Sequence, residues 1–292
     1  MNGSLKSLIL SLLALSAPGT LLADRAHDLA KVAAQQKGVA GCGPSSLTSQ
    51  TCHQQFPTGC TSSTTVTYDP YLNFLKDQTP GAALAPTAVL GRADFQSLEG
   101  KTPSGMTKRN HAQFASQLAP LGEGNIVTVF AYLFFVEDTG KTASGKPSIG
   151  ETCNCQLRLP GSYDFHIGLG FDKTLAAQIR KSKKQPAHGG PTTMGKTSVV
   201  AEMTPHTRGP NWTLARVISL RGQQVKVVGQ LTLDNEHLNA KDDCGFPGAA
   251  ASCWRSTVWE VHPVTQFYVC NLSSGCNASS PDSAWTSLDD LP

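Results

Sequence analysis

Apolar and polar residues alternate along two segments in the second half of the chain, residues 163–170 (YDFHIGLG) and 259–270 (WEVHPVTQFYVC). A period of two is typical of β-strands, because successive side chains point to opposite faces. In each segment one face is apolar, and the other carries an acidic residue and a histidine two positions apart. These pairs are Asp164 with His166 and Glu260 with His262. We therefore predict two strands that pack one face into a core and present carboxylates and imidazoles on the other.

Three further segments have the composition of strands. The five expected strands are, in order, residues 126–136, 163–170, 198–203, 225–233 and 256–269. A helix-compatible stretch at 212–220 separates the third from the fourth, which is the order of the OB-fold. Gly229 inside the fourth strand fits a bulge where a barrel bends. We predict a mainly β protein, an OB-like five-stranded Greek-key barrel with one or two helices over residues 121–270. A β-sandwich and a looser α+β domain are the alternatives.

The chain before the barrel divides into two parts. Residues 1–23 place Lys6 ahead of a short apolar run and small residues, which is the pattern of a secretory signal peptide, cleaved here near Ala23. Residues 24–120 are predicted to be a Cys-containing irregular extension with short helices at 24–37, 69–76 and 111–118. Residues 80–105 show little periodicity and are predicted to be irregular.

Residues 271–292 are predicted to be a disordered polar tail. The longest apolar stretch, residues 127–136, is much shorter than the roughly 20 apolar residues of a membrane helix. We therefore predict a protein without a membrane span that is secreted or periplasmic.

The nine cysteines support export, since disulfides persist in oxidising compartments. The odd count leaves at least one thiol free or paired between chains. Cys153 and Cys155 are too close in sequence for an unstrained mutual bond, so each is expected to reach a distant partner. The formal net charge of +3 gives no strong steering toward an acidic partner.

Four motifs carry a resemblance to a known family. They are E-T-C-N-C at 151–155, D-F-H at 164–166, V-x-V-x-G-x-L-x-x-D at 225–234 and W-E-V-H-P-V at 259–264. Together they resemble a family of uncharacterised exported bacterial proteins with an OB-like domain. The resemblance covers roughly residues 111–270 and implies the fold and export, but no reaction.

A P-loop-like string runs from Gly190 to Thr197 (GPTTMGKT). A working P-loop needs a strand before it and a helix after it, so that backbone N–H groups converge on phosphates. Here a polar loop precedes the string and a strand pattern follows it. We therefore predict no ATP binding.

Acidic residues and histidines form the candidate site. In OB-folds the outer face around the second and third strands binds oligonucleotides and oligosaccharides. The residues predicted to contact such a ligand are Asp164, His166, Glu202 and Arg208. The predicted metal ligands are His166, His237 and His262, which would hold zinc or manganese, with Glu202 or Glu260 as catalytic base.

Three interpretations of these residues remain open: polar groups that face water or bond across strands, a metal site, and acid–base chemistry without metal. Two hypotheses of function follow. The first is an exported, disulfide-stabilised OB-like binding or structural module, with no cofactor and with a glycan or nucleic acid as candidate ligand. The second is a metal-dependent hydrolase, a phosphoesterase or nuclease. The sequence alone does not decide whether the protein is an enzyme.

Overall fold

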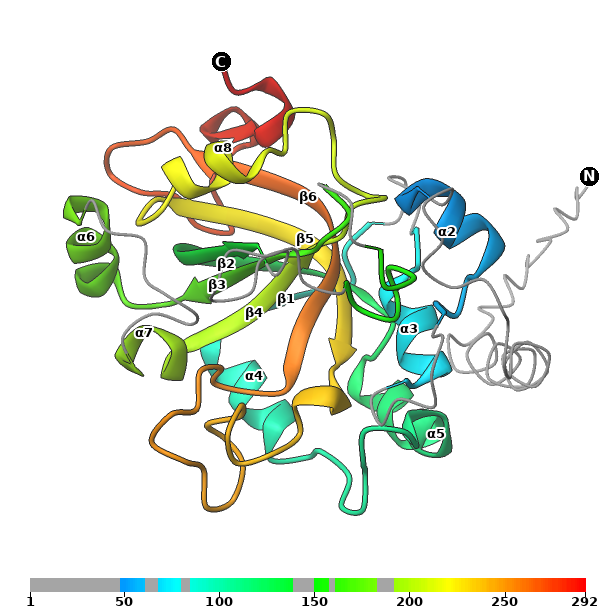
Figure 1. Cartoon of the computed structure of the whole chain (residues 1–292). Helices are drawn as coiled ribbons and strands as arrows, with labels where there is room; N and C mark the ends of the chain where they lie inside the picture. The colour runs from blue at the N-terminus through cyan, green and yellow to red at the C-terminus, as the bar shows by residue number, and fades with distance from the viewer. Residues whose placement is uncertain (1–47, 61–67, 80–84, 139–149, 158–160, 183–191) are drawn as a thin grey trace, which may run out of the picture.

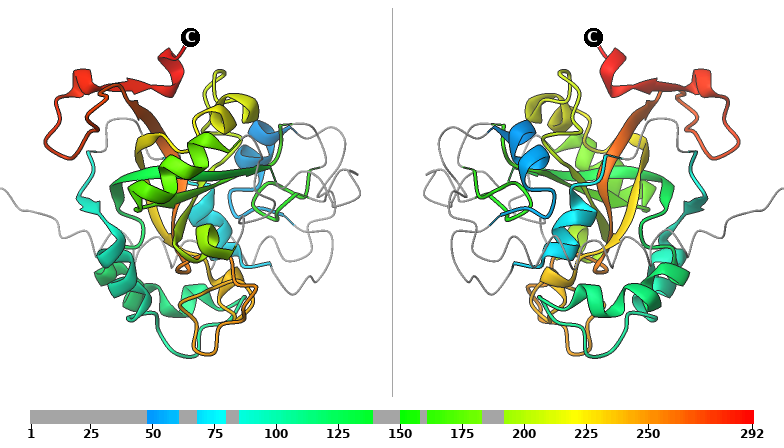
Figure 2. Two further views of the ribbon diagram at one scale, coloured as in Figure 1. Left: turned by 90° about the vertical axis from the view of Figure 1, so that its left-hand side faces the viewer. Right: turned by 90° about the vertical axis from the view of Figure 1, so that its right-hand side faces the viewer.

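A computed structural model describes residues 48–60, 68–79, 85–138, 150–157, 161–182 and 192–292. The predicted signal peptide and the predicted helix at 24–37 lie outside the described residues. The fold is mainly β, with short helices around a closed five-stranded barrel (Figures 1 and 2).

The barrel strands are β2 (Ile126–Asp138), β3 (Phe165–Gly170), β4 (Ser198–Met203), β5 (Gln224–Leu233) and β6 (Trp259–Cys270). They pair in the order β2-β3-β4-β6-β5, and β5 pairs again with β2 to close the barrel. All of these pairings are antiparallel except β4 with β6, which run parallel. The five predicted strand segments are confirmed. Because the strands close into one barrel, the two alternatives, a β-sandwich and a looser α+β domain, are excluded.

Alternation places the apolar side chains inside the barrel. Val129, Ile167, Ala201, Val227 and Val261 are fully buried members of one apolar cluster. The pairing of β5 with β6 is irregular on both sides of Gly229, which confirms the predicted bend. A Cβ at this position would overlap the carbonyl of Pro263, so the close approach of the two strands requires glycine.

Two short strands extend the barrel. β1 (Ala88–Leu90) runs parallel to β2, and β7 (Trp285–Ser287) pairs antiparallel with the end of β6. The first lies in the region predicted to be irregular. The second lies in the predicted disordered tail, which is instead ordered because Trp285 is buried against Phe130 and Tyr268. Both predictions are therefore corrected.

The helices lie around the barrel. They are α2 (Ser49–Gln55), α3 (Pro70–Lys76), α4 (Arg92–Glu99), α5 (Ala115–Leu118), α6 (Lys173–Lys181), α7 (Thr192–Lys196) and α8 (Leu214–Ser219), with short 3₁₀ turns at η1 (His111–Phe114), η2 (Ala119–Leu121), η3 (Asn235–His237), η4 (Asp282–Ala284) and η5 (Leu288–Asp290). The predicted helices at 69–76, 111–118 and 212–220 are confirmed. Helices α2 and α3 lie on one side of the barrel, and α6 and α7 lie on the other (Figure 1). None of the helices in the described part of the chain combines the length and apolarity needed to cross a bilayer.

Disulfides connect distant parts of the described chain. Cys52 of α2 pairs with Cys155 across 103 positions. Two local disulfides join Cys244 with Cys253 and Cys270 with Cys276, and Cys60 is also disulfide-bonded. The prediction of a distant disulfide partner is confirmed for Cys155. The same prediction is wrong for Cys153, since this residue is a buried free thiol.

Candidate functional site

The polar outer face of β3, β4 and β6 is covered by other parts of the chain and does not face water. Glu202, Glu260 and His262 have no exposed surface, and His166 is 6% exposed. The cover comes from residues 48–60, 68–79 and 150–157, which include α2, α3 and the disulfide between Cys52 and Cys155. The interpretation of these side chains as solvated surface groups is therefore wrong, because the N-terminal segments return to this face.

Glu202 is the centre of the buried group. Its Oε1 lies 3.0 Å from His166 Nε2 on the neighbouring strand, and its Oε2 lies 3.2 Å from His262 Nδ1. His262 Nδ1 also lies 3.2 Å from Glu260 Oε1, and Glu260 in turn pairs with the guanidinium of Arg255. The cross-strand interpretation of the acid–histidine pairs is thus seen directly, since His166 and Glu202 are register partners.

A second carboxylate, Asp234, joins α3 to the barrel. Its Oδ2 lies 3.0 Å from Lys76 Nζ at the end of α3 and 3.6 Å from Arg255 Nη1. Lys76 Nζ also lies 3.4 Å from Glu151 Oε2, and Glu151 Oε1 lies 3.7 Å from His166 Nε2. The connected set is called the ion network here. Its members are Lys76, Glu151, Asp164, His166, Glu202, Asp234, Arg255, Glu260 and His262.

The two histidines around Glu202 have opposite pKa shifts. Burial by itself would lower the pKa of His166, but the carboxylates of Glu202, Glu151 and Asp164 outweigh it and raise that pKa to about 10. Burial dominates at His262 and lowers its pKa to about 4, because Glu202 offsets only part of the desolvation. At neutral pH His166 is therefore a cation, whereas His262 is a neutral imidazole.

The carboxylates also differ in their pKa. Burial raises the pKa of Asp164 well above its ordinary value, and Glu151 and Glu202 raise it further. Burial would raise the pKa of Glu151 too, but Lys76 and His166 reverse the effect and lower it to about 2. Strongly perturbed titratable groups gathered in one place are typical of functional sites and also of buried structural ion pairs.

Hydrogen bonding within the ion network is incomplete. Asp164 Oδ2 accepts a hydrogen bond from Asn154 Nδ2 at 2.8 Å, whereas its Oδ1 has no partner. Buried polar atoms without a hydrogen bond also include His166 Nδ1, His262 Nε2 and Arg255 Nε. Because nearly all buried polar atoms in folded proteins are paired, these atoms are the ones that a bound water or ligand would satisfy.

The ion network approaches solvent at Glu151, whose side chain is 25% exposed. Trp254 lies beside this margin, with its ring edge-on to His237 at 5.2 Å and to His166 at 6.5 Å between ring centroids. Trp254 Nε1 donates to Asp242 Oδ1 at 3.1 Å, which orients the indole. The margin therefore combines a carboxylate, imidazoles and an aromatic face.

The three predicted metal-binding histidines do not meet at one point. His166 and His262 contact opposite oxygens of Glu202, while His237 Nδ1 lies 3.2 Å from Asp242 Oδ2. Four groups of three residues, drawn from the ion network and the neighbouring Cys153, have candidate ligand atoms within 4.8 Å of one another. None of these four groups contains two of the three predicted histidines. Among these groups are Glu151 with His166 and Glu202, and Asp164 with Glu202 and His262.

The predicted ligand-binding residue Arg208 lies beside the start of β3. Its guanidinium carbon lies 3.8 Å from the centroid of the Phe165 ring, and its Nη1 donates to the carbonyl of Tyr163 at 2.8 Å. These contacts fix Arg208 on the edge of β3.

The predicted strand after the P-loop-like string is β4, which follows the five-residue helix α7.

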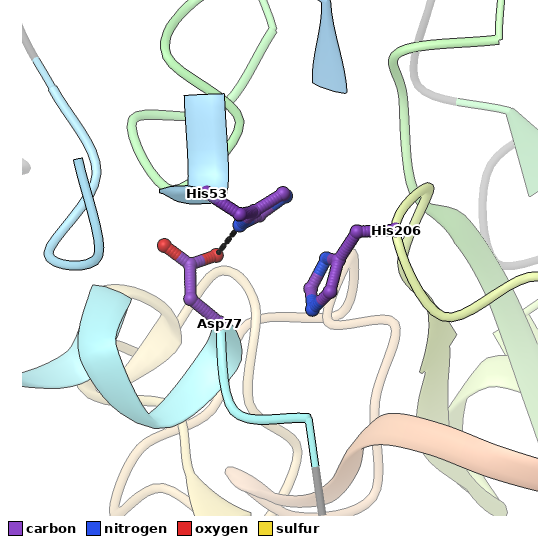
Figure 3. A group of neighbouring side chains, drawn as sticks. All are labelled: His53, Asp77 and His206. Carbon is purple, nitrogen blue, oxygen red and sulfur yellow. Dashed lines mark ion pairs between the residues drawn. The ribbon is translucent and has the colours of Figure 1, made fainter. Parts of the chain in front are cut away.

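A second group of ligating side chains was missed from the sequence. His53 of α2, Asp77 after α3 and His206 after β4 converge (Figure 3), and their candidate ligand atoms lie within 4.8 Å of one another. We call them the His–Asp–His group. The nearest two members are 24 positions apart and carry no shared motif, so only the fold reveals them.

No protein-family model, curated protein or solved structure matches this chain.

Proposed function

We propose that the protein is an exported, disulfide-stabilised, OB-like module that binds a hydroxyl-rich glycan at the margin of the ion network. Three features support the OB-like interpretation of the barrel: the strand order, the parallel closure of β4 on β6, and α8 between β4 and β5. The three disulfides among the described residues support export.

The observation that carries the proposal is the incomplete hydrogen bonding of the ion network behind its solvent-facing margin at Glu151. A buried polar atom that has no hydrogen bond lowers the stability of the folded state by about 1–3 kcal/mol, so a purely structural network would be expected to satisfy it. The orphaned atoms include both acceptors and donors, for example Asp164 Oδ1 and Arg255 Nε. Hydroxyl groups complement such a mixture, because each hydroxyl both donates and accepts.

Charge favours a glycan over a nucleic acid. Affinity for nucleic acid comes mainly from Lys and Arg that contact phosphates. Lys76 and Arg255 are fully buried and already bound to carboxylates, and the exposed member of the network is the acidic Glu151. A carboxylate beside an aromatic ring repels phosphate but accepts hydrogen bonds from sugar hydroxyls.

The test is a thermal-shift screen of the disulfide-intact protein with neutral oligosaccharides of hexoses and of N-acetylated amino sugars, followed by calorimetry of any hit. A single-stranded oligonucleotide serves as the comparison ligand. We expect a saccharide to bind, and Trp254→Ala and Glu151→Gln to weaken binding at least about tenfold. Arg92→Ala on the exposed face of α4 is the control and should bind like wild type. A preference for the oligonucleotide, or equal binding by all variants, would refute the proposal.

Hydrolysis is the second candidate, and the opposite pKa shifts of His166 and His262 are the observation that favours it. A protonated imidazole and a neutral imidazole that share Glu202 are suited to act as acid and base. Assays with chromogenic phosphodiester, ester and glycoside substrates test this candidate. Turnover that is lost in both His166→Gln and Glu202→Gln would favour hydrolysis over simple binding.

A further inference from the structure

The His–Asp–His group has the composition of a metal site. Two imidazoles and one carboxylate come from three separate parts of the chain, and the fourth position of a tetrahedral zinc site would be left for water. Ligand atoms about 2.0–2.2 Å from a zinc ion lie at most about 4 Å apart. The three side chains are therefore within a small adjustment of closing around one ion (Figure 3).

The second, independent observation is that these side chains are buried without hydrogen bonds. The side chains of His53 and Asp77 are 7% and 2% exposed. Both ring nitrogens of His53 and of His206, and both carboxylate oxygens of Asp77, have no hydrogen-bond partner of acceptable geometry. Asp77 Oδ1 lies 2.8 Å from His53 Nδ1, so these two atoms contact each other without an aligned hydrogen bond. Buried polar atoms without aligned hydrogen bonds are costly, and a shared metal ion would satisfy one atom of each side chain.

The two imidazoles also lie close enough to bind one ion. Their rings are 3.7 Å apart between centroids, a distance that two imidazolium cations would not tolerate.

The group differs from the ion network in its charge compensation. In the ion network Lys76 and Arg255 already pair with Glu151, Asp234 and Glu260, and a metal ion there would have to compete with them. Lys76 directs its ammonium group to Asp234 and Glu151, so no Lys or Arg of the described residues forms an ion pair with the Asp77 carboxylate. A divalent ion is therefore better accommodated here than among the sequence-predicted ligands.

We propose that His53, Asp77 and His206 form a binding site for a divalent transition metal, with zinc as the best match to the two-nitrogen, one-oxygen donor set. His53 follows Cys52, whose disulfide fixes α2, and Asp77 follows Lys76, whose ion pairs fix the end of α3. His206 lies three positions after the end of β4. The bound ion would join both N-terminal helices to the barrel, independently of any ligand at the margin of the ion network.

The experiment measures metal content in protein that carries no affinity His-tag, after removal of metal with a chelator and refilling with zinc or cobalt(II). We expect about one ion per chain in wild type, and visible absorption of the cobalt form typical of low coordination number. His53→Gln and His206→Gln should lose both the ion and the absorption. His237→Gln is the matched control, since it removes a half-buried histidine outside the group, and it should bind metal like wild type.

Three outcomes would overturn the proposal: wild type without metal, metal retained in both His53→Gln and His206→Gln, or metal lost only in His166→Gln, which would move the ion to the ion network. Near-UV circular dichroism checks that each variant is folded. Should the two variants fail to fold, cobalt in the wild-type protein supplies the second measurement. It should broaden the imidazole resonances of His53 and His206 before those of His166, and the reverse order would refute the site.

Discussion

Replacing His111 with glutamine should remove a large part of the pH dependence of stability. The His111 imidazole is fully buried, with Nε2 2.8 Å from Glu123 Oε1 and Nδ1 2.8 Å from Asn235 Oδ1. Asn235 donates through its own Nδ2 to the carbonyl of Thr107, so its Oδ1 must accept. Both ring nitrogens of His111 therefore face acceptors, and the protonated imidazolium satisfies both.

The magnitude follows from the pKa. Burial would lower the pKa of His111, but Glu123 and the other nearby acceptors outweigh it and raise that pKa from the ordinary 6.5 to about 9. At about 1.36 kcal/mol per pH unit, this corresponds to roughly 3 kcal/mol of folding free energy. The folded state binds the extra proton between these values, so the stabilisation is complete below pH 6.5 and is lost as the pH rises through about 9.

The assay is urea unfolding of the disulfide-intact protein at a pH below 6 and a pH above 9, followed by circular dichroism. The stability difference between wild type and His111→Gln should shrink by about 3 kcal/mol across this interval. Glu123→Gln should give a similar result, because it keeps the imidazole and removes the carboxylate that raises its pKa. A difference that stays constant within about 1 kcal/mol, the uncertainty of the extrapolation, would refute the assignment of a buried imidazolium.

Three further predictions concern stability. Lys76→Met leaves buried carboxylates uncompensated and should cost about 3–5 kcal/mol in urea unfolding, whereas a cost below about 1 kcal/mol would show that the pairs contribute little. Replacing both Cys52 and Cys155 with alanine opens a loop of 103 residues and should cost about 4–5 kcal/mol by the chain-entropy estimate, with an unchanged melting temperature as the contrary result. Gly168→Ala would drive a Cβ into the ring of Phe135, so we expect a loss of at least about 1–3 kcal/mol by overpacking, and wild-type stability would show that the ring can move aside.

The alternation of side chains was sufficient to predict the strands, because burial of one face requires a period of two. It could not show what covers the other face. Glu260 and His262 were correctly predicted on the strand face opposite to Trp259, but only the return of residues 48–60, 68–79 and 150–157 makes that face an interior one. A polar strand face that is solvated and one that is covered by a distant segment have the same local sequence.

The candidate site was predictable only in part, for the same reason. His166 and Glu202 lie on neighbouring strands, and their recurring acid–histidine pattern identified them. His53 and His206 lie in segments without periodicity, and no local signal relates them to Asp77. Helix α4 was missed because only Phe95 and Leu98 among its residues are buried, too few to produce a recognisable apolar period.

The ion pair between Lys76 and Asp234 bears on how this protein can be divided. A fragment beginning at residue 121 would contain every strand of the barrel, and by strand count it would be a complete domain. It would lack the ammonium group that neutralises Asp234, and it would also lack α2 and α3, which exclude water from Glu202 and His262. Its acids would keep Arg255 and the cover of residues 150–157, but they would be more exposed to water and less compensated in charge. The N-terminal segment therefore supplies the positive charge of Lys76 that the barrel carboxylates need. The barrel contains nearly all of the strands, yet its charges are balanced only when the N-terminal segment is present.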